Sequence, residues 1–127
     1  MTDEYRERPW VYVAGPYTHG DLNENIRNAC HVADKVWDAG FLPIVPHVTQ
    51  VWDLISPKPV AFWYDYDLHL LAQCDHLIRL PGDSPGADRE AVFAIKRRIP
   101  CYLGIQHFLD SMAVAAAAPL LTQSRQA

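Results

Sequence analysis

Half of the 127 residues are hydrophobic and a fifth are charged, which is enough apolar material for one domain with its own core. The net charge of −4 comes without a basic stripe, which argues against a nucleic-acid polymer as partner but leaves a single nucleotide open, because polymer binding depends on Lys and Arg at phosphates. No apolar run reaches the length of a membrane span and the charged start lacks a signal core, so we expect a cytoplasmic protein without membrane contact. The three cysteines are unevenly spaced, so we expect no disulfides.

The first half of the chain is predicted to form a strand, a helix, a second strand and a loop. Residues 10–14 are an apolar strand, and a helix follows over residues 21–40, where a capping-box-like start precedes apolar residues at helical spacing. Residues 41–45 form the second strand, and Pro43 within it indicates an edge position. Residues 46–59 are predicted to be a loop.

The second half continues the same alternation. Its predicted elements are, in chain order, a helix over residues 60–74, a strand over 75–80, a helix over 85–98, a short strand over 101–103 and an Ala-rich helix over about 108–118.

Alternation of strand and helix predicts an α/β fold. We expect a single flavodoxin-like (Rossmann-like) domain over residues 1–127, with a four- to five-stranded parallel sheet in the order 2-1-3-4(-5) and helices on both faces. Ligands bind such sheets at the carboxyl ends of the strands, where the strand order reverses. That point lies between the first and third strands and is flanked by the loops at residues 15–21 and 81–90.

The second of these loops combines an anion cradle with a carboxylate. Ser84 and Gly86 lie in a Ser-Pro-Gly turn between a strand and a helix, where free N–H groups and the helix dipole attract an anion. Glu90 follows within the helix, with apolar residues after it. It is either a solvated carboxylate paired with Arg89 or Arg97, or a nucleophile or general base.

A second carboxylate, Asp67, lies on the apolar stripe of the helix at 60–74. A charged group on such a face is costly unless it has a partner or a task. Asp67 either pairs with a nearby N–H or histidine, or meets Glu90 across a pocket. Two carboxylates near one sugar are what cleavage of a glycosidic bond requires.

The remaining candidates lie near the first two strands. Tyr12 either packs in its strand or orients the nucleophile, and Tyr17, after Pro16, could stack on a base. Gly15 is either a simple turn residue or one that lets a ligand approach the backbone. His47 is either a packing residue or a contact to a phosphate or base. The six histidines show no metal-ligand spacing and no cofactor motif is present, so we expect neither a metal nor a cofactor.

Four segments together resemble the superfamily of nucleoside 2-deoxyribosyltransferases and related nucleotide N-glycosidases. They come in family order and span most of the chain, so that 1–127 is expected to be one such domain. The segments are Val11-Tyr12-Val13-Ala14-Gly15-Pro16-Tyr17, Pro46-His47, Trp63-Tyr64-Asp65-Tyr66-Asp67-Leu68 and Ser84-Pro85-Gly86-Ala87-Asp88-Arg89-Glu90.

The resemblance implies an enzyme that cleaves or transfers the N-glycosidic bond of a nucleoside or its 5′-monophosphate. Glu90 matches the nucleophile that forms a covalent glycosyl-enzyme, and Asp67 matches the carboxylate that handles the leaving base or positions the sugar. Tyr12 matches a tyrosine that holds the glutamate. Gly15 matches the close-approach glycine, and His47 matches a histidine of the monophosphate hydrolases.

Ser84 is the position that separates the two branches of the superfamily. Transferases acting on free nucleosides carry an acidic residue there, whereas the monophosphate N-glycosidases carry a serine, so the resemblance favours a 5′-monophosphate. The first loop lacks the arginine common in those enzymes, and Asp83 and Asp88 flank the cradle with like charge unless they point away. The resemblance also implies a homodimer or higher homo-oligomer, for which the Ala-rich last helix is the candidate contact.

Three other functions stay open at this point. One is a nucleotide sensor that binds without turnover, since fold does not set function. Another is a 2-deoxyribosyltransferase proper, acting on free nucleosides. The third is cleavage of a nicotinamide dinucleotide, which the compact first loop disfavours.

Overall fold

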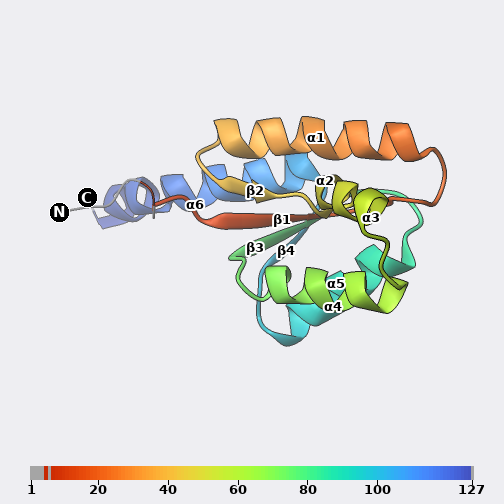
Figure 1. The fold of residues 1–127 in the computed structure, drawn as a ribbon. Helices are drawn as coiled ribbons and strands as arrows, with labels where there is room; N and C mark the ends of the chain where they lie inside the picture. Colours follow the sequence, from red (N-terminus) through yellow and green to blue (C-terminus); the bar gives the residue numbers. More distant parts are fainter. Residues whose placement is uncertain (1–4, 6, 127) are drawn as a thin grey trace.

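The computed structural model describes residue 5 and residues 7–126, so that most of the charged start considered above lies outside the described residues. Its centre is a four-stranded, all-parallel sheet in the order β2-β1-β3-β4 (Figure 1). The strands are β1 (Trp10–Ala14), β2 (Leu42–Ile44), β3 (His76–Arg79) and β4 (Cys101–Leu103). The predicted order is confirmed, β2 with its proline is an edge strand, and the described residues contain no fifth strand.

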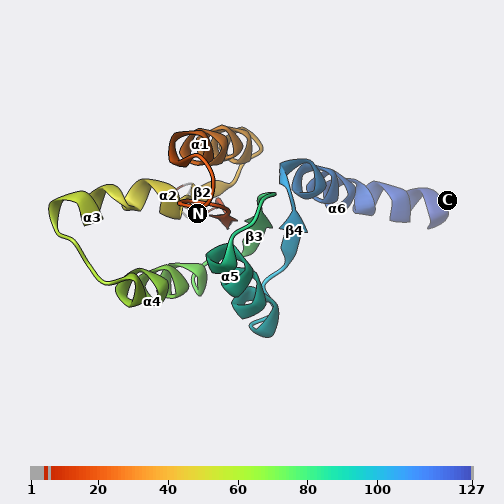
Figure 2. The ribbon, with the colours of Figure 1, turned by 90° about the vertical axis from the view of Figure 1, so that its right-hand side faces the viewer.

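Two pairs of helices cover the two faces of the sheet, as Figures 1 and 2 show. Helices α1 (Leu22–Asp38) and α6 (Ile105–Gln126) lie on one face, and α4 (Val60–Leu71) and α5 (Pro85–Lys96) lie on the other. Strand β1 serves both cores because its side chains alternate between faces: Val11 and Val13 pack toward α1 and α6, whereas Tyr12 packs toward α4 and α5. The phenol of Tyr12 is thereby directed to the side that carries Asp67 and Glu90.

Side-chain caps fix the starts of the helices on either side of the switch point. The Asp21 carboxylate accepts a hydrogen bond from the Glu24 backbone N–H at 3.1 Å and begins α1. The Ser84 hydroxyl oxygen accepts one from the Ala87 N–H at 3.1 Å and begins α5, with Pro85 in its first turn. Both starts agree with the sequence signals.

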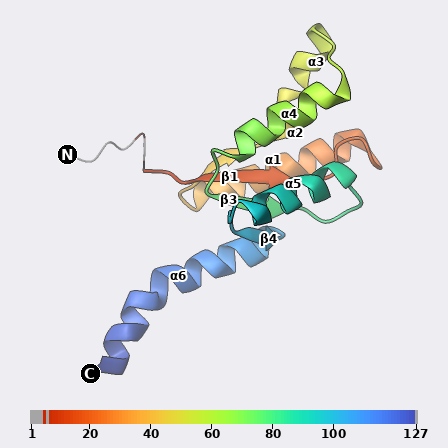
Figure 3. The ribbon, with the colours of Figure 1, turned by 90° about the horizontal axis from the view of Figure 1, so that it is seen from below.

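Two predictions about local structure were wrong. Residues 46–59 contain two short helices, α2 (Pro46–Thr49) and α3 (Val51–Ile55), in place of a loop, because elements this short leave no measurable periodicity. Helix α6 begins before residue 108 and continues past Pro119 to Gln126. Its second half extends beyond the sheet (Figure 3). The homo-oligomer expected there stays a prediction.

Among the described residues, no helix has both the length and the apolar character needed to cross a lipid bilayer.

Candidate active site

A cavity of about 440 Å³ opens at the carboxyl ends of β1 and β3, where the strand order reverses. Its wall comes from the β1–α1 loop, from α2 and α3, from α4 and from the first two turns of α5. Of the predicted site residues, the following line it: Gly15, Tyr17, His47, Asp67, Ser84, Gly86 and Glu90. Tyr12 and Pro16 lie behind this lining and contact it.

Tyr12 anchors Glu90 to the central strand. The Tyr12 side chain is fully buried, and its hydroxyl donates a hydrogen bond to Oε2 of Glu90. Burial, followed by the charge of Glu90, raises the pKa of Tyr12 well above its ordinary value, so the phenol keeps its proton and stays a donor. Glu90 is therefore held in one orientation at the cavity wall by a residue of the sheet.

The two carboxyl groups influence each other electrostatically. Burial raises the pKa of Glu90 to about 7, although the hydrogen bond from Tyr12 opposes this, and the charge of Asp67 raises it further. Burial alone raises the pKa of Asp67 to about 7. Two such coupled acids lose their protons in two steps that belong to the pair. The hydrogen bond from Tyr12 favours the ionised form of Glu90 and so opposes protonation of this member of the pair.

The carboxyl group of Asp67 has a buried oxygen atom without a hydrogen-bond partner among the described residues. Its Oδ1 is buried and makes no hydrogen bond within the part of the chain that the structure describes. The alternative expected from the sequence, in which Asp67 pairs with an N–H group or a histidine, is therefore not observed at Oδ1. A buried and unpartnered carboxyl oxygen costs free energy, and groups kept at such a cost cluster at functional sites.

The N-terminal turn of α5 forms a further part of the cavity wall. Ser84 is buried and its oxygen caps the helix, which leaves the hydroxyl proton free to be donated to a ligand. A Cβ at Gly86 would come no closer than 3.9 Å to Tyr64, so packing does not require glycine there.

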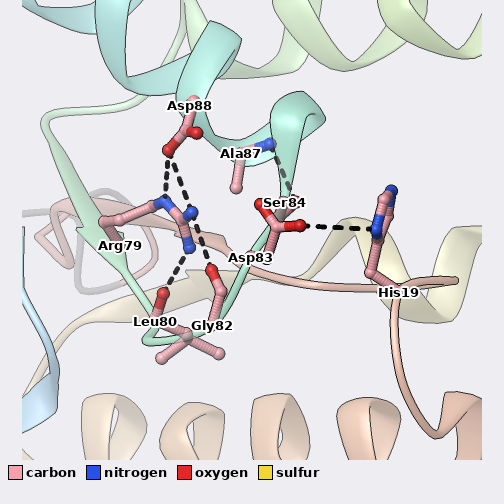
Figure 4. Close-up of polar contacts among 8 residues, drawn as sticks. All are labelled: His19, Arg79, Leu80, Gly82, Asp83, Ser84, Ala87 and Asp88. Carbon is pink, nitrogen blue, oxygen red and sulfur yellow. Dashed lines mark hydrogen bonds and ion pairs between the residues drawn. The ribbon is translucent and has the colours of Figure 1, made fainter.

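The two acidic residues that flank the cradle do not line the cavity. Asp88 forms an ion pair with Arg79 at 2.9 Å, and Arg79 also donates to the carbonyls of Leu80 and Gly82 (Figure 4). Asp83 lies 3.8 Å from His19, and this contact joins the two loops that flank the switch point. The charge of Asp88 is thus paired with the Arg79 guanidinium, which reduces its repulsion of an anion in the cradle, whereas the Asp83 side chain is 86% exposed.

His47 is held as a neutral ring behind the first loop. It is 5% exposed, and its Nε2–H donates to the Pro16 carbonyl at 2.9 Å, since a carbonyl can only accept. Burial lowers the pKa of His47, so it carries no charge to offer a phosphate at neutral pH. The Tyr17 ring meets the His47 ring edge-on, with centroids 6.0 Å apart, and forms part of the cavity wall.

A family model described as a domain of unknown function (DUF7768) matches residues 9–103. The chain belongs to this family. The match contains every residue of the candidate site and ends before α6. No curated protein is significantly similar to the chain.

A similar fold occurs in a 2-deoxyribosyltransferase from the psychrotolerant bacterium Bacillus psychrosaccharolyticus, a protein described as a biocatalyst for nucleoside synthesis. The TM-score is 0.55 and 19% of residues are identical, over 74% of this chain and 70% of that chain. At 19% identity, this similarity shows that the two proteins share a fold and no more than that.

Sequence reasoning assigned no site role to several cavity-lining residues of this DUF7768 domain, among them Asp53, Lys58, Trp63 and Arg89. Asp53 and Lys58 come from the segment predicted to be a loop, and Trp63 lies in the predicted helix over residues 60–74 and in a segment that carries the resemblance, without a role of its own. Arg89 was treated only as a partner for Glu90, whereas its guanidinium lies 4.0 Å from the centre of the Tyr64 ring at the cavity wall. Among these residues, only Arg89 could have been suspected from the sequence, because it follows closely after the Ser-Pro-Gly turn. The described residues contain no group of three or more His, Cys, Asp and Glu side chains placed to hold a metal ion.

Replacing Gly15 with Ala is expected to destabilise the DUF7768 domain by about 1–3 kcal/mol, because the added Cβ would lie 2.9 Å from the Leu80 Cβ. Denaturant unfolding measures the change. Gly86→Ala is the matched control, since its Cβ meets nothing closer than 3.9 Å and should leave stability nearly unchanged. Equal stability of the two variants would show that Gly15 is not required by packing.

Proposed function

We propose that this protein cleaves, or transfers, the N-glycosidic bond of a (deoxy)nucleoside 5′-monophosphate or nucleoside through a covalent intermediate on Glu90. The observation that carries the proposal is the arrangement of Glu90, held by the buried Tyr12 hydroxyl, in the same cavity wall as the unpartnered carboxyl of Asp67. A fixed carboxylate beside a protonated acid is the pair that glycosidic cleavage needs.

In the first step, the Glu90 carboxylate attacks the anomeric carbon while the bond from that carbon to the base nitrogen breaks. The electrons of that bond go to the base, and Asp67 gives its proton to the leaving nitrogen. The Tyr12 hydrogen bond keeps the carboxylate in line without neutralising it.

In the second step, water or another base attacks the anomeric carbon and breaks the ester to Glu90. The proton of the incoming group goes to the Asp67 carboxylate, which restores both groups to their starting states. Attack by water makes the protein a hydrolase, and attack by a second base makes it a transferase.

The end of the cavity near α5 supports a phosphate on the substrate. Ser84 can donate its hydroxyl proton, the dipole of α5 favours an anion at its N-terminus, and Lys58 and Arg89 line the cavity. His47 is a wall of the pocket in this proposal, because its neutral ring has its N–H committed to Pro16.

A panel of nucleosides and their 5′-monophosphates, each incubated with and without a free base and separated by chromatography, tests the proposal. We expect free base from at least one 5′-monophosphate, at a higher kcat/KM than from the matching nucleoside. A new nucleoside formed only when free base is added identifies a transferase. Nucleotides that bind and stay intact over hours would contradict catalysis and indicate the sensor.

A further inference from the structure

Asp53, in the α3 wall of the cavity, has one carboxylate oxygen fixed and the other free. Its Oδ1 accepts two hydrogen bonds of 2.8 Å, one from the indole N–H of Trp63 in α4 and one from the backbone N–H of Lys58. Donors from two different segments therefore set the orientation of the carboxylate.

The second oxygen, Oδ2, has no partner in the described part of the protein. It makes no hydrogen bond or ion pair within the residues that the structure describes, and it is not among their buried unpartnered polar atoms. The ammonium of Lys58, the nearest cation in sequence, bonds to the Ser56 hydroxyl at 2.9 Å instead. Because Asp53 lines the cavity, Oδ2 is the acceptor that this wall offers to a ligand.

Asp53 also lies near Tyr17, the ring available for stacking on a base. Its charge contributes to raising the pKa of the Tyr17 hydroxyl, after burial, so the two groups are within electrostatic reach. The hydrogen bond from Trp63 and that from Lys58 lower the pKa of Asp53, which keeps the carboxylate ionised at neutral pH. An aromatic face and an ionised edge acceptor together suit a flat ring that carries N–H groups.

We propose that Asp53 selects nucleobases that present an exocyclic amino group over those that present an oxo group at the same position. The proposal rests on the proposed function for the location of the base. A carboxylate can only accept, so an amino group gains a charge-assisted hydrogen bond, whereas an oxo group sets its lone pairs against a negative charge.

Asp53→Asn gives a sharp test because the two N–H donors dictate how the amide must lie. Only the amide oxygen can accept from Trp63 and Lys58, so the NH₂ group takes the position of Oδ2. The free atom thus changes from acceptor to donor while the hydrogen bonds to the rest of the protein are kept. Asp65→Asn is the matched control, since it removes the same charge from an exposed position of α4 outside the cavity.

The measurement is calorimetric binding of two pairs of probes, the 5′-monophosphates of deoxycytidine and deoxyuridine and those of deoxyadenosine and deoxyinosine. In the unaltered protein, we expect the amino member of at least one pair to bind about tenfold or more tightly. Asp53→Asn should shift that ratio by about tenfold or more toward the oxo member, and Asp65→Asn should leave it unchanged. Thermal unfolding of each variant establishes that it is folded.

The outcomes separate this inference from the proposed function. Equal affinities within both pairs in the unaltered protein overturn the role of Asp53 without any variant, as does a ratio that Asp53→Asn leaves unchanged. Binding with the expected ratios but no release of base contradicts catalysis and leaves the selection by Asp53 standing. Failure of all four nucleotides to bind at millimolar concentration overturns both.

Discussion

Glu90→Gln is expected to lower the rate of base release by about a thousandfold or more, because the amide cannot form the glycosyl ester. The amide oxygen can still accept the hydrogen bond of Tyr12, so the shape of the site is kept. Release of base from a saturating 5′-monophosphate, followed by chromatography, measures the change. Mass spectrometry of the acid-quenched protein should show an added sugar phosphate in the unaltered chain and none in the variant.

The stability of the same variant provides a control. Folding raises the pKa of the Glu90 carboxyl from its ordinary value of 4.5 to about 7. The contribution of this shift to the stability of the fold is therefore complete below pH 4.5 and is lost as the pH rises through about 7. Glu90→Gln, which cannot ionise, should therefore unfold at a higher temperature than the unaltered protein at about pH 8. A variant that is more stable but inactive excludes misfolding as the cause, whereas unchanged activity would remove Glu90 from the mechanism. Glu24→Gln, on α1 outside the cavity, should match the unaltered protein in both measurements.

Asp67→Asn is expected to lower kcat/KM by about a hundredfold or more, because the leaving base must then depart without a proton. The loss should be smaller for 5-fluorouracil than for uracil as the leaving base, since the more acidic base needs less help. This dependence on the leaving base separates a proton donor from a residue that only shapes the pocket. Equal losses for the two bases would contradict the role.

The pH profile of kcat/KM gives the second readout for Asp67. The proposed mechanism needs an ionised Glu90 and a protonated Asp67, whose pKa values are each raised to about 7. We therefore expect a bell-shaped profile with its maximum near neutral pH. Asp67→Asn should lose the fall on the alkaline side, because that limb reports the proton on Asp67. The rise on the acid side should remain.

Elements with strong local signals could be predicted from the sequence. The alternation indicated the strand order and the switch point, and the Ser-Pro-Gly turn indicated the start of the helix at Pro85, so Glu90 and the end of β1 could be assigned to one site. The inward direction of Tyr12 follows from strand alternation once the faces are known, but the faces are set by packing. The partners of Asp83 and Asp88 could not be predicted, since both pairs join segments whose approach depends on the fold.

The contribution of α3 was missed for a different reason. A helix of five residues with no buried side chain carries neither periodicity nor a core face, so nothing in its composition places Asp53 in the cavity. Its position is fixed by the contacts to Trp63 and Lys58, which lie outside α3.

The exposure of α3 affects how this protein can diversify. Leu54 and Ile55 are 78% and 84% exposed, whereas Tyr12, behind the cavity lining, is fully buried in the sheet. Mutations in α3 can therefore accumulate at little cost to folding, while mutations around Tyr12 disturb the core. Libraries randomised in α3 should yield altered ligand preference in well-folded protein, and natural lineages can take the same route, retaining one reaction while changing the molecules it acts on.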